Sequence, residues 1–219
     1  MAFVKTEVQG AVEIITIDRP KALNALNPEV LADLKAAFEA VDQNTIRCIV
    51  LTGEGDKSFV AGADIGSMST MTKAEGEAFG KLGNDVFLMI ESFPVPVIAA
   101  VNGPAAGGGA SFAMAADIRI ASTNAKFINA QINVGMSGAD MGSSFMLPRL
   151  IGVSKAAELI YTGRPVLADE GERIGLFNKV VAPEELMDTA LEYAKILLGK
   201  SEMGLLLTKE CLHAAMDGS

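Results

Sequence analysis

The sequence predicts an α/β domain with largely buried strands, and two observations support this class. Apolar runs rich in β-branched residues alternate along the chain with segments in which apolar residues recur at helical spacing. Half of the 219 residues are hydrophobic and 22 are glycine, a composition typical of a folded chain and not of a disordered one. We therefore expect strands that helices cover on both faces.

The first elements can be placed from the N-terminus. Residues 12–18 are rich in β-branched residues and predict a strand, which a turn at residues 9–10 joins to a strand at 3–8. A helix is expected from Asn27 onward, because Asn followed by Pro28 is typical of a helix start and apolar residues then recur at helical spacing.

The remaining elements alternate in the same way. Short apolar runs closed by turn residues predict buried strands, and longer stretches with one apolar face predict helices. The expected strands are 48–51, 97–101 and 118–121, and the expected helices are 73–91, 154–161, 183–198 and 204–216. The first two of these strands each end in a glycine turn followed by a glycine-rich loop, which is compatible with an internal repeat.

Two regions are expected along the chain. Residues 1–200 contain no linker-like or low-complexity segment and are predicted to form one core domain. Residues 201–219 are predicted to begin a C-terminal helical region that is truncated at Asp217-Gly218-Ser219.

The charge and cysteine content limit the possible partners and location. The net charge is −9 and the sequence contains no Lys/Arg cluster, which argues against a nucleic-acid partner. Two distant cysteines, Cys48 and Cys211, and an N-terminus without an apolar signal core favour a cytoplasmic protein with reduced thiols. The uncharged run at 92–116 has the length of a membrane span, but prolines and glycines interrupt it, so we expect buried structure and no membrane partner.

A glycine-rich loop after the strand at 97–101 is the first candidate for function. The strand ends at Asn102-Gly103, and the loop leads into Gly107-Gly108-Gly109 and a predicted helix. Glycines allow close approach to the backbone, and a helix N-terminus offers free N–H groups that suit an anion or a developing oxyanion. The same glycines also suit tight packing of helix on sheet, and the residues alone leave both readings open. A dinucleotide site is disfavoured because GPAAGGG lacks the G-x-G-x-x-G order.

Several motifs in a fixed order then identify a resemblance. They are RPKALNAL (Arg19–Leu26), KSFVAGADI (Lys57–Ile65), PVIAAVNGPAAGGG (Pro96–Gly109), ADIRIAS (Ala116–Ser122), LPRLIG (Leu147–Gly152) and ERIGLFNKVV (Glu172–Val181). In this order they resemble the crotonase (enoyl-CoA hydratase/isomerase) superfamily over about residues 5–215. The resemblance implies an α/β spiral of repeated ββα units, assembled as a homotrimer or hexamer, that acts on acyl-CoA thioesters.

The resemblance also implies a set of site residues. The backbone amides of Ala63 and Gly108 would form an oxyanion hole for the thioester oxygen. Coenzyme A would enter as part of the substrate, with no permanently bound cofactor. Its phosphates would lie near Lys21, Ala22 and Leu23, and its adenine near Ala61, Asp64 and Ile65. Either Lys21 or Arg19 could meet a phosphate charge, although an exposed cation needs no such partner.

Two positions depart from the family pattern. Hydratases of this family activate water with two glutamates, and those positions correspond here to Ser111 and Gln131. Neither replacement can accept a proton near neutral pH, and losing one general base costs on the order of 10² to 10⁴ in rate. Two-carboxylate hydration is therefore in doubt.

One acidic residue remains near the substituted positions. Asp140 lies in MSGADMGSSF, which is similar to a segment that carries a catalytic aspartate in the dienoyl-CoA isomerase branch. A single carboxylate beside an oxyanion hole can move a double bond by removing and returning a proton. Ser111, Gln131 and Met136 are expected to line the substrate pocket near it. The alternative is that Asp140 caps the helix that follows.

The sequence contains no arrangement for the other common chemistries. His213 is the only histidine and lies far from the motifs, so no Ser-His-Asp triad and no metal site is expected. The leading hypothesis is an enzyme for enoyl-CoA hydration or double-bond isomerisation. The alternatives are a non-catalytic acyl-CoA binding protein and, with less support, a structural subunit, both suggested by the missing glutamates.

Overall fold

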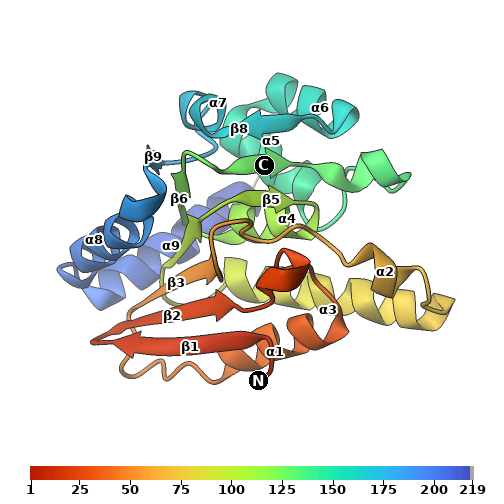
Figure 1. Cartoon of the computed structure of the whole chain (residues 1–219). Coiled ribbons are helices and arrows are strands. Elements are labelled where there is room, and N and C mark those ends of the chain that lie inside the picture. Colours follow the sequence, from red (N-terminus) through yellow and green to blue (C-terminus); the bar gives the residue numbers. More distant parts are fainter. Residues whose placement is uncertain (218–219) are drawn as a thin grey trace.

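The computed structural model describes residues 1–217, whose strands form two sheets (Figure 1). The larger sheet has the strand order β1-β2-β3-β4-β6-β9, and all its pairs are parallel except β1 with β2. Its strands are β1 (Val4–Gln9), β2 (Val12–Ile17), β3 (Cys48–Gly53), β4 (Val97–Val101), β6 (Ile118–Ser122) and β9 (Lys179–Val181). The smaller sheet consists of β5 (Pro104–Ala106), β7 (Lys126–Ile128) and β8 (Pro165–Leu167).

Helices surround both sheets. The α-helices are α1 (Pro28–Glu39), α2 (Ile65–Met68), α3 (Lys73–Glu91), α4 (Gly108–Ala115), α5 (Ser143–Ile151), α6 (Val153–Thr162), α7 (Ala168–Arg173), α8 (Leu186–Leu198) and α9 (Glu202–Asp217). Three short 3₁₀ helices are η1 (Pro20–Ala22), η2 (Ala130–Val134) and η3 (Pro183–Glu185). The expected strands of the large sheet and the expected helices are confirmed, whereas β9 and the short strands of the small sheet were not predicted.

Alternate residues of the central strands pack into two separate cores. Ile49 and Val97 belong to the larger core, which α1 and α3 cover. Val50 and Ile98 belong to the second core together with Leu186 and Ala190 of α8. Helix α8 covers this side of the large sheet (Figure 1). Because both faces are covered, β3 and β4 are continuous apolar runs instead of alternating ones, which is typical of parallel sheets.

The same sequence of elements recurs along the chain. After β4 joins the large sheet, β5 joins the small one and α4 follows; after β6 come β7, η2 and α5. The segment after β3 behaves likewise, because Val60 forms a parallel bridge to Ala105 of β5 and the chain then enters α2 and α3. The internal repeat that the sequence allows therefore corresponds to successive units of the chain whose strands pair in parallel.

Local sequence signals determine where the helices begin. Asn27 accepts a hydrogen bond from the Val30 amide at 2.8 Å, so the predicted cap of α1 is confirmed. Thr72 and Glu75 form a reciprocal capping box at the start of α3.

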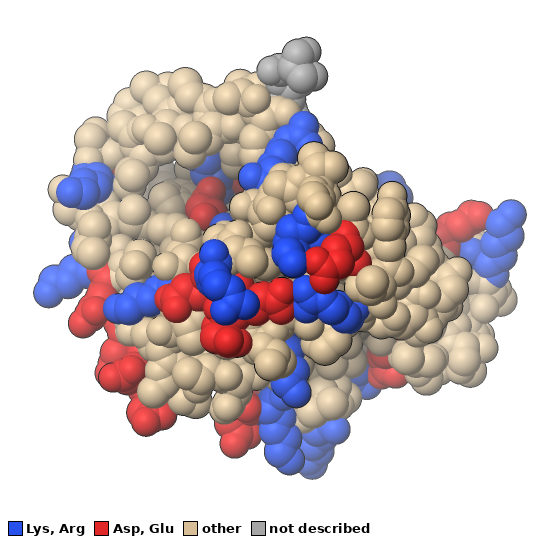
Figure 2. Space-filling model, turned by 90° about the horizontal axis from the view of Figure 1, so that it is seen from above, with Lys and Arg blue, Asp and Glu red and all other residues tan. Residues whose placement is uncertain are grey.

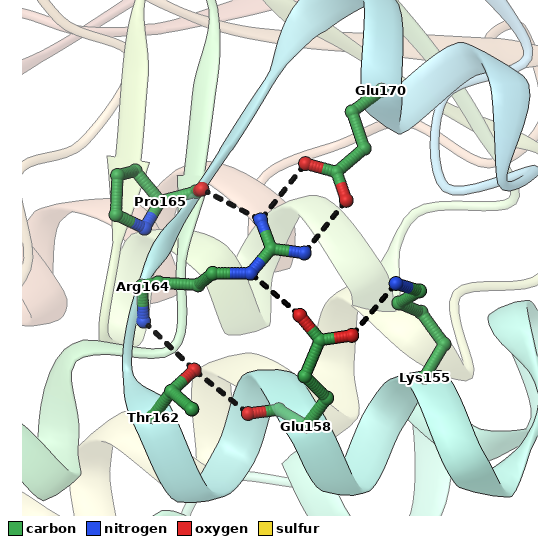
Figure 3. A network of polar contacts seen from close by, with 6 residues as sticks. All are labelled: Lys155, Glu158, Thr162, Arg164, Pro165 and Glu170. Carbon is green, nitrogen blue, oxygen red and sulfur yellow. Dashed lines mark hydrogen bonds and ion pairs between the residues drawn. The ribbon is translucent and has the colours of Figure 1, made fainter.

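An ion-pair network joins α6 to α7 at one end of the molecule (Figure 3). Arg164 donates from Nε to Glu158 and from its terminal nitrogens to Glu170, at 2.7–2.8 Å. Lys155 and then Arg164 hold the pKa of Glu158 below its usual value, and Arg164 does the same for the pKa of Glu170. The network thereby fixes the turn that leads into β8.

The C-terminal helix is attached to the core by a partly buried ion pair. The Nζ atom of Lys209 in α9 lies 2.8 Å from the Oδ2 atom of Asp117. The last two residues of the predicted C-terminal region, Gly218 and Ser219, lie outside the described residues. Among the helices that the structure describes, none combines the length and the apolar character needed to cross a membrane.

Candidate active site

Two glycine-containing loops meet beside β5 of the small sheet. The first follows β3 and the second joins β5 to α4. The Ala106 amide donates to the Val60 carbonyl at 3.0 Å, and a Cβ atom at Gly109 would overlap that same carbonyl. A Cβ atom at Gly62, which has a φ of +94°, would lie 2.9 Å from the Ala106 carbonyl oxygen. Glycine at positions 62 and 109 is therefore required for this close approach of the two backbones.

Two backbone amides remain free where the loops meet. Gly62 and Gly107 are neighbours, since a Cβ atom at Gly107 would lie 3.9 Å from the Cα atom of Gly62. Ala63 and Gly108 follow them directly. Within residues 1–217, neither of these two amides donates a hydrogen bond to a carbonyl or a side chain. Gly108 is the first residue of α4, where a helix leaves its N–H groups without internal acceptors.

A mostly apolar cavity of about 520 Å³ contains both positions. It lies between α2, α3, the start of α4 and the η2 region. Its lining includes Ala63 and Gly108 together with Gln131, Met136 and Asp140, so the structure brings these five predicted residues to one cavity. Among the lining side chains of the described chain, that of Asp140 is the only ionisable one.

The loop before α5 holds the Asp140 carboxylate. Its Oδ1 atom accepts a hydrogen bond from the Met141 amide at 2.9 Å. The α5 helix begins at Ser143 with Gly142 at its N-cap position and no side-chain cap. The Asp140 side chain therefore does not cap α5, and the capping role considered from the sequence is removed. Asp140 is half-buried.

Gln131 has an unusual environment for a buried polar residue. Its side chain is 7 % exposed, and within the described chain neither Nε2 nor Oε1 has a hydrogen-bond partner. An unpaired buried polar atom costs roughly 1–3 kcal/mol, so native proteins usually provide a partner, a water or a ligand. Gln131 thus adds unsatisfied hydrogen-bonding capacity to the wall of the cavity.

Ser111 does not line the cavity, contrary to the expectation from the sequence. It lies in the first turn of α4 on the side that faces the core and is fully buried. Its hydroxyl donates to the Gly107 carbonyl at 3.4 Å. The position on α4 that corresponds to a family glutamate therefore carries a hydroxyl group that contacts its own helix.

The residues expected near coenzyme A are divided between two places. Ala61 and Ile65 line the cavity, and Ile65 is 69 % exposed at its rim. Lys21 and Leu23 are exposed at η1, next to the half-buried Ala22, and the three do not line the cavity.

Asp64 has a structural partner. Its Oδ2 atom lies 2.7 Å from Nη1 of Arg19, and its Oδ1 atom accepts from the Ser67 amide as the N-cap of α2. The Arg19 guanidinium, and then the backbone amide of Ser67, hold the pKa of the Asp64 carboxyl below its usual range. Arg19 is therefore engaged within the protein, whereas Lys21 remains the exposed cation of this motif.

Sequence reasoning missed part of the cavity wall. Gly76, Gly80 and Gly83 of α3 all line it, and a Cβ atom at either Gly76 or Gly80 would meet no atom within 4 Å. Met141 lies against Gly83 and Gly108 and has a φ of +46°, which is uncommon for a residue with a side chain. Three glycines spaced i, i+4 and i+7 within a helix were the available signal.

The surroundings provide no other catalytic cluster. His213 lies 3.3 Å from Glu91 between α9 and α3, and does not line the cavity. In residues 1–217, no group of three His, Cys, Asp or Glu side chains could hold a metal ion. Acidic and basic side chains are mixed across the face seen in Figure 2 and do not gather into one basic patch.

Comparisons with known proteins identify the family and similar folds. A family model described as enoyl-CoA hydratase/isomerase matches residues 7–219. The chain is 45 % identical over 212 residues to a short-chain-enoyl-CoA hydratase of Clostridium acetobutylicum, covering 96 % of this chain and 81 % of the relative. It is similar in structure to an enoyl-CoA hydratase from Bacillus anthracis, with a TM-score of 0.96, 31 % identity and coverage of 99 % and 84 %. It is also similar to a monofunctional enoyl CoA isomerase from M. smegmatis, with a TM-score of 0.86, 34 % identity and coverage of 100 % and 96 %.

Proposed function

This chain belongs to the enoyl-CoA hydratase/isomerase family and is an acyl-CoA-processing enzyme, and we propose that it moves the double bond of an enoyl-CoA thioester. The observation that carries the proposal is the cavity where two free amides and a single carboxylate, that of Asp140, are lining groups.

The two amides would stabilise the negative charge that develops on the thioester oxygen. The N–H groups of Ala63 and Gly108 are fixed by the loop contacts and have no acceptor of their own in the described chain. Donors fixed in advance in a largely apolar cavity need no reorganisation when charge develops, and each is worth roughly 3–4 kcal/mol in the transition state.

Asp140 would act as the one base. Its carboxylate removes a proton from a carbon of the acyl chain, and the electron pair of that C–H bond enters the conjugated system and places negative charge on the thioester oxygen. The protonated carboxyl then returns the proton to a different carbon, and the double bond has moved. Atoms and charge balance without a co-reactant, and proton transfer by one positioned group contributes about 10² to 10⁴ in rate.

Isomerisation requires one proton carrier, whereas water addition by the two-glutamate route requires two. The residues at the two glutamate positions are Ser111, which is buried in α4, and Gln131, which cannot accept a proton. The side chains that line the cavity thus favour isomerisation.

Hydration is the second candidate, favoured by the name of the relative at 45 % identity. Gln131 has two unpaired polar atoms that could orient a water, with Asp140 taking its proton. The two candidates differ in product, so one assay separates them.

The test is to supply 3-enoyl-CoA and 2-enoyl-CoA separately and follow the ultraviolet absorbance of the conjugated thioester. Isomerisation makes the absorbance rise with the first substrate, and hydration makes it fall with the second. Asp140→Asn is expected to lower kcat by about 10² to 10⁴. Asp56→Asn, which removes an exposed carboxylate outside the cavity, is the control and is expected to leave kcat unchanged.

Activity of Asp140→Asn equal to wild type on both substrates contradicts the assigned base. Absence of turnover with either substrate, together with tight binding of acyl-CoA in calorimetry, supports a binding protein instead.

Three further features belong to the same proposal. We propose that coenzyme A lies along η1 and the Ala61–Ile65 segment, with Lys21 near a phosphate, so Lys21→Ala should raise KM and leave kcat unchanged.

We propose a homotrimer or hexamer, which light scattering tests. A cytoplasmic location is consistent with the free thiols of Cys48 and Cys211 and can be checked by fractionation.

A further inference from the structure

We propose that Asn129 is a positioning residue, which places the Asp140 carboxylate by holding the loop that precedes it. The inference rests on the proposed function, in which Asp140 is the base. It concerns a residue that lies outside the lining of the cavity and acts only through that loop.

Asn129 is attached to a rigid part of the fold. It directly follows β7, whose two neighbours in the small sheet are β5 and β8. Its side chain is 1 % exposed, and its Nδ2 atom donates to the carbonyl oxygen of Gly138 at 2.8 Å. A short hydrogen bond therefore joins the end of a sheet strand to the loop, two residues before Asp140.

Gly138 also packs closely against α6. A Cβ atom there would lie 2.8 Å from Cγ2 and 3.0 Å from the carbonyl oxygen of Ile160 in α6. The same Cβ atom would lie 3.2 Å from Nδ2 of Asn129, so the loop packs against both Asn129 and α6, and the Gly138 carbonyl is directed toward the asparagine.

A shift at Gly138 would pass directly to the base. The Ala139 amide donates to Ser137 Oγ at 3.2 Å and the Asp140 amide to the Ser137 carbonyl at 3.4 Å, so residues 137–140 form one tight turn. Within residues 1–217, Asn129 is the only side chain before residue 137 that donates a hydrogen bond to this turn. Loss of the Asn129 hydrogen bond would therefore release the turn from the end of β7.

The chain offers a control four residues away that makes the same kind of hydrogen bond, although it is exposed where Asn129 is buried. Asn133, at the end of η2, donates from Nδ2 to the carbonyl oxygen of Gly163 at 2.9 Å. That glycine ends α6, and the bond makes no contact with residues 137–140. Both asparagines thus use the same group to hold a glycine carbonyl, but only one holds the loop of Asp140.

The experiment compares Asn129→Ala, the isosteric Asn129→Asp and Asn133→Ala by steady-state kinetics on the enoyl-CoA substrate that wild type turns over. Both Asn129 variants should lower kcat about 10- to 100-fold, since a misplacement of 1 Å can cost 10²-fold, with KM within about twofold. Asn133→Ala should keep kcat within about twofold of wild type. Thermal melts show that each variant is folded at the assay temperature.

A second measurement separates positioning from general damage. If Asn129 acts through Asp140, adding Asn129→Ala to Asp140→Asn should lower kcat no further, because the two changes remove one function. Multiplicative effects in the double variant overturn the inference, as does an Asn129→Ala or Asn129→Asp kcat equal to that of Asn133→Ala. The proposed function fails separately, when Asp140→Asn alone has the activity of wild type.

Discussion

The Nη1 atom of Arg19 lies 2.7 Å from the Oδ2 atom of Asp64, the residue directly after the free amide of Ala63. Asp64 also donates its own amide to the Leu26 carbonyl at 2.8 Å and caps α2. The ion pair and these bonds fix the peptide that presents the Ala63 N–H. Through Arg19, the RPKALNAL motif therefore supports the loop that carries the proposed oxyanion hole.

Replacing Arg19 should loosen that peptide. We expect Arg19→Met to lower kcat by roughly tenfold, since one imperfectly held donor loses part of its transition-state interaction. Arg173→Met, which changes an exposed arginine, is the control. Steady-state kinetics on both variants checks the prediction, and equal kcat values would contradict it.

The same ion pair predicts a pH dependence of stability. Because the folded-state pKa of Asp64 is lowered, chiefly by Arg19, its contribution is present above the usual value of 3.8 and is lost as the pH falls through the folded pKa. The melting temperature of Arg19→Met should therefore lie below that of wild type at pH 7. Melting curves should converge as the pH drops below 3.8, and a constant difference would show that the ion pair is not its source.

Two adjacent glycines should respond differently to alanine. At Gly109 the new Cβ atom would overlap the Val60 carbonyl, a backbone atom that cannot move alone, so we expect a loss of roughly 3 kcal/mol in unfolding free energy. At Gly108 the nearest atoms are the side-chain ends of Leu26 at 2.9 Å and Met141 at 3.4 Å, which can shift. Gly108→Ala should cost about 1 kcal/mol in stability and lower kcat by about 10². Urea unfolding and kinetics on both variants test this contrast.

Glu13 is a buried carboxylate without a partner in the described part of the chain. It lies in β2 at 7 % exposure, and burial raises its pKa above the usual 4.5. An acid whose folded pKa is raised destabilises the fold once the pH rises through that pKa, because the folded state binds the proton more tightly. Glu13→Gln should therefore melt higher than wild type at pH 7 and equal to it at low pH. Glu7→Gln on the exposed strand β1 is the control.

The buried pair of Lys209 and Asp117 should be sensitive to loss of one partner. The two side chains are 8 % and 24 % exposed, and Asp117 Oδ2 also accepts from the Val97 amide at 2.7 Å. Lys209→Met leaves the carboxylate without its cation and should cost about 3 kcal/mol in unfolding free energy. Adding Asp117→Asn should recover part of that loss in urea unfolding, whereas additive losses would mean that the pair is not coupled.

The sequence by itself determined the elements and the family. Apolar runs and glycine turns predicted the strands of the large sheet except β9, and the Asn27 and Thr72 regions carried local signals that start helices. Such signals depend on neighbours in the chain, so they can be read without coordinates. The short strands β5, β7 and β8 carry no such pattern, because three residues are too few for a period.

The tertiary structure alone decided which side chains share the cavity. The order of motifs indicated Ala63 and Gly108, but only the packing of the two loops places these amides, Gln131 and Asp140 on one cavity. It also turned Ser111 into the core, engaged Arg19 with Asp64, and ended the proposal that Asp140 is a cap. Arg19 and Asp64 are 45 positions apart along the chain, as are Ala63 and Gly108, and local sequence patterns do not encode contacts at that separation.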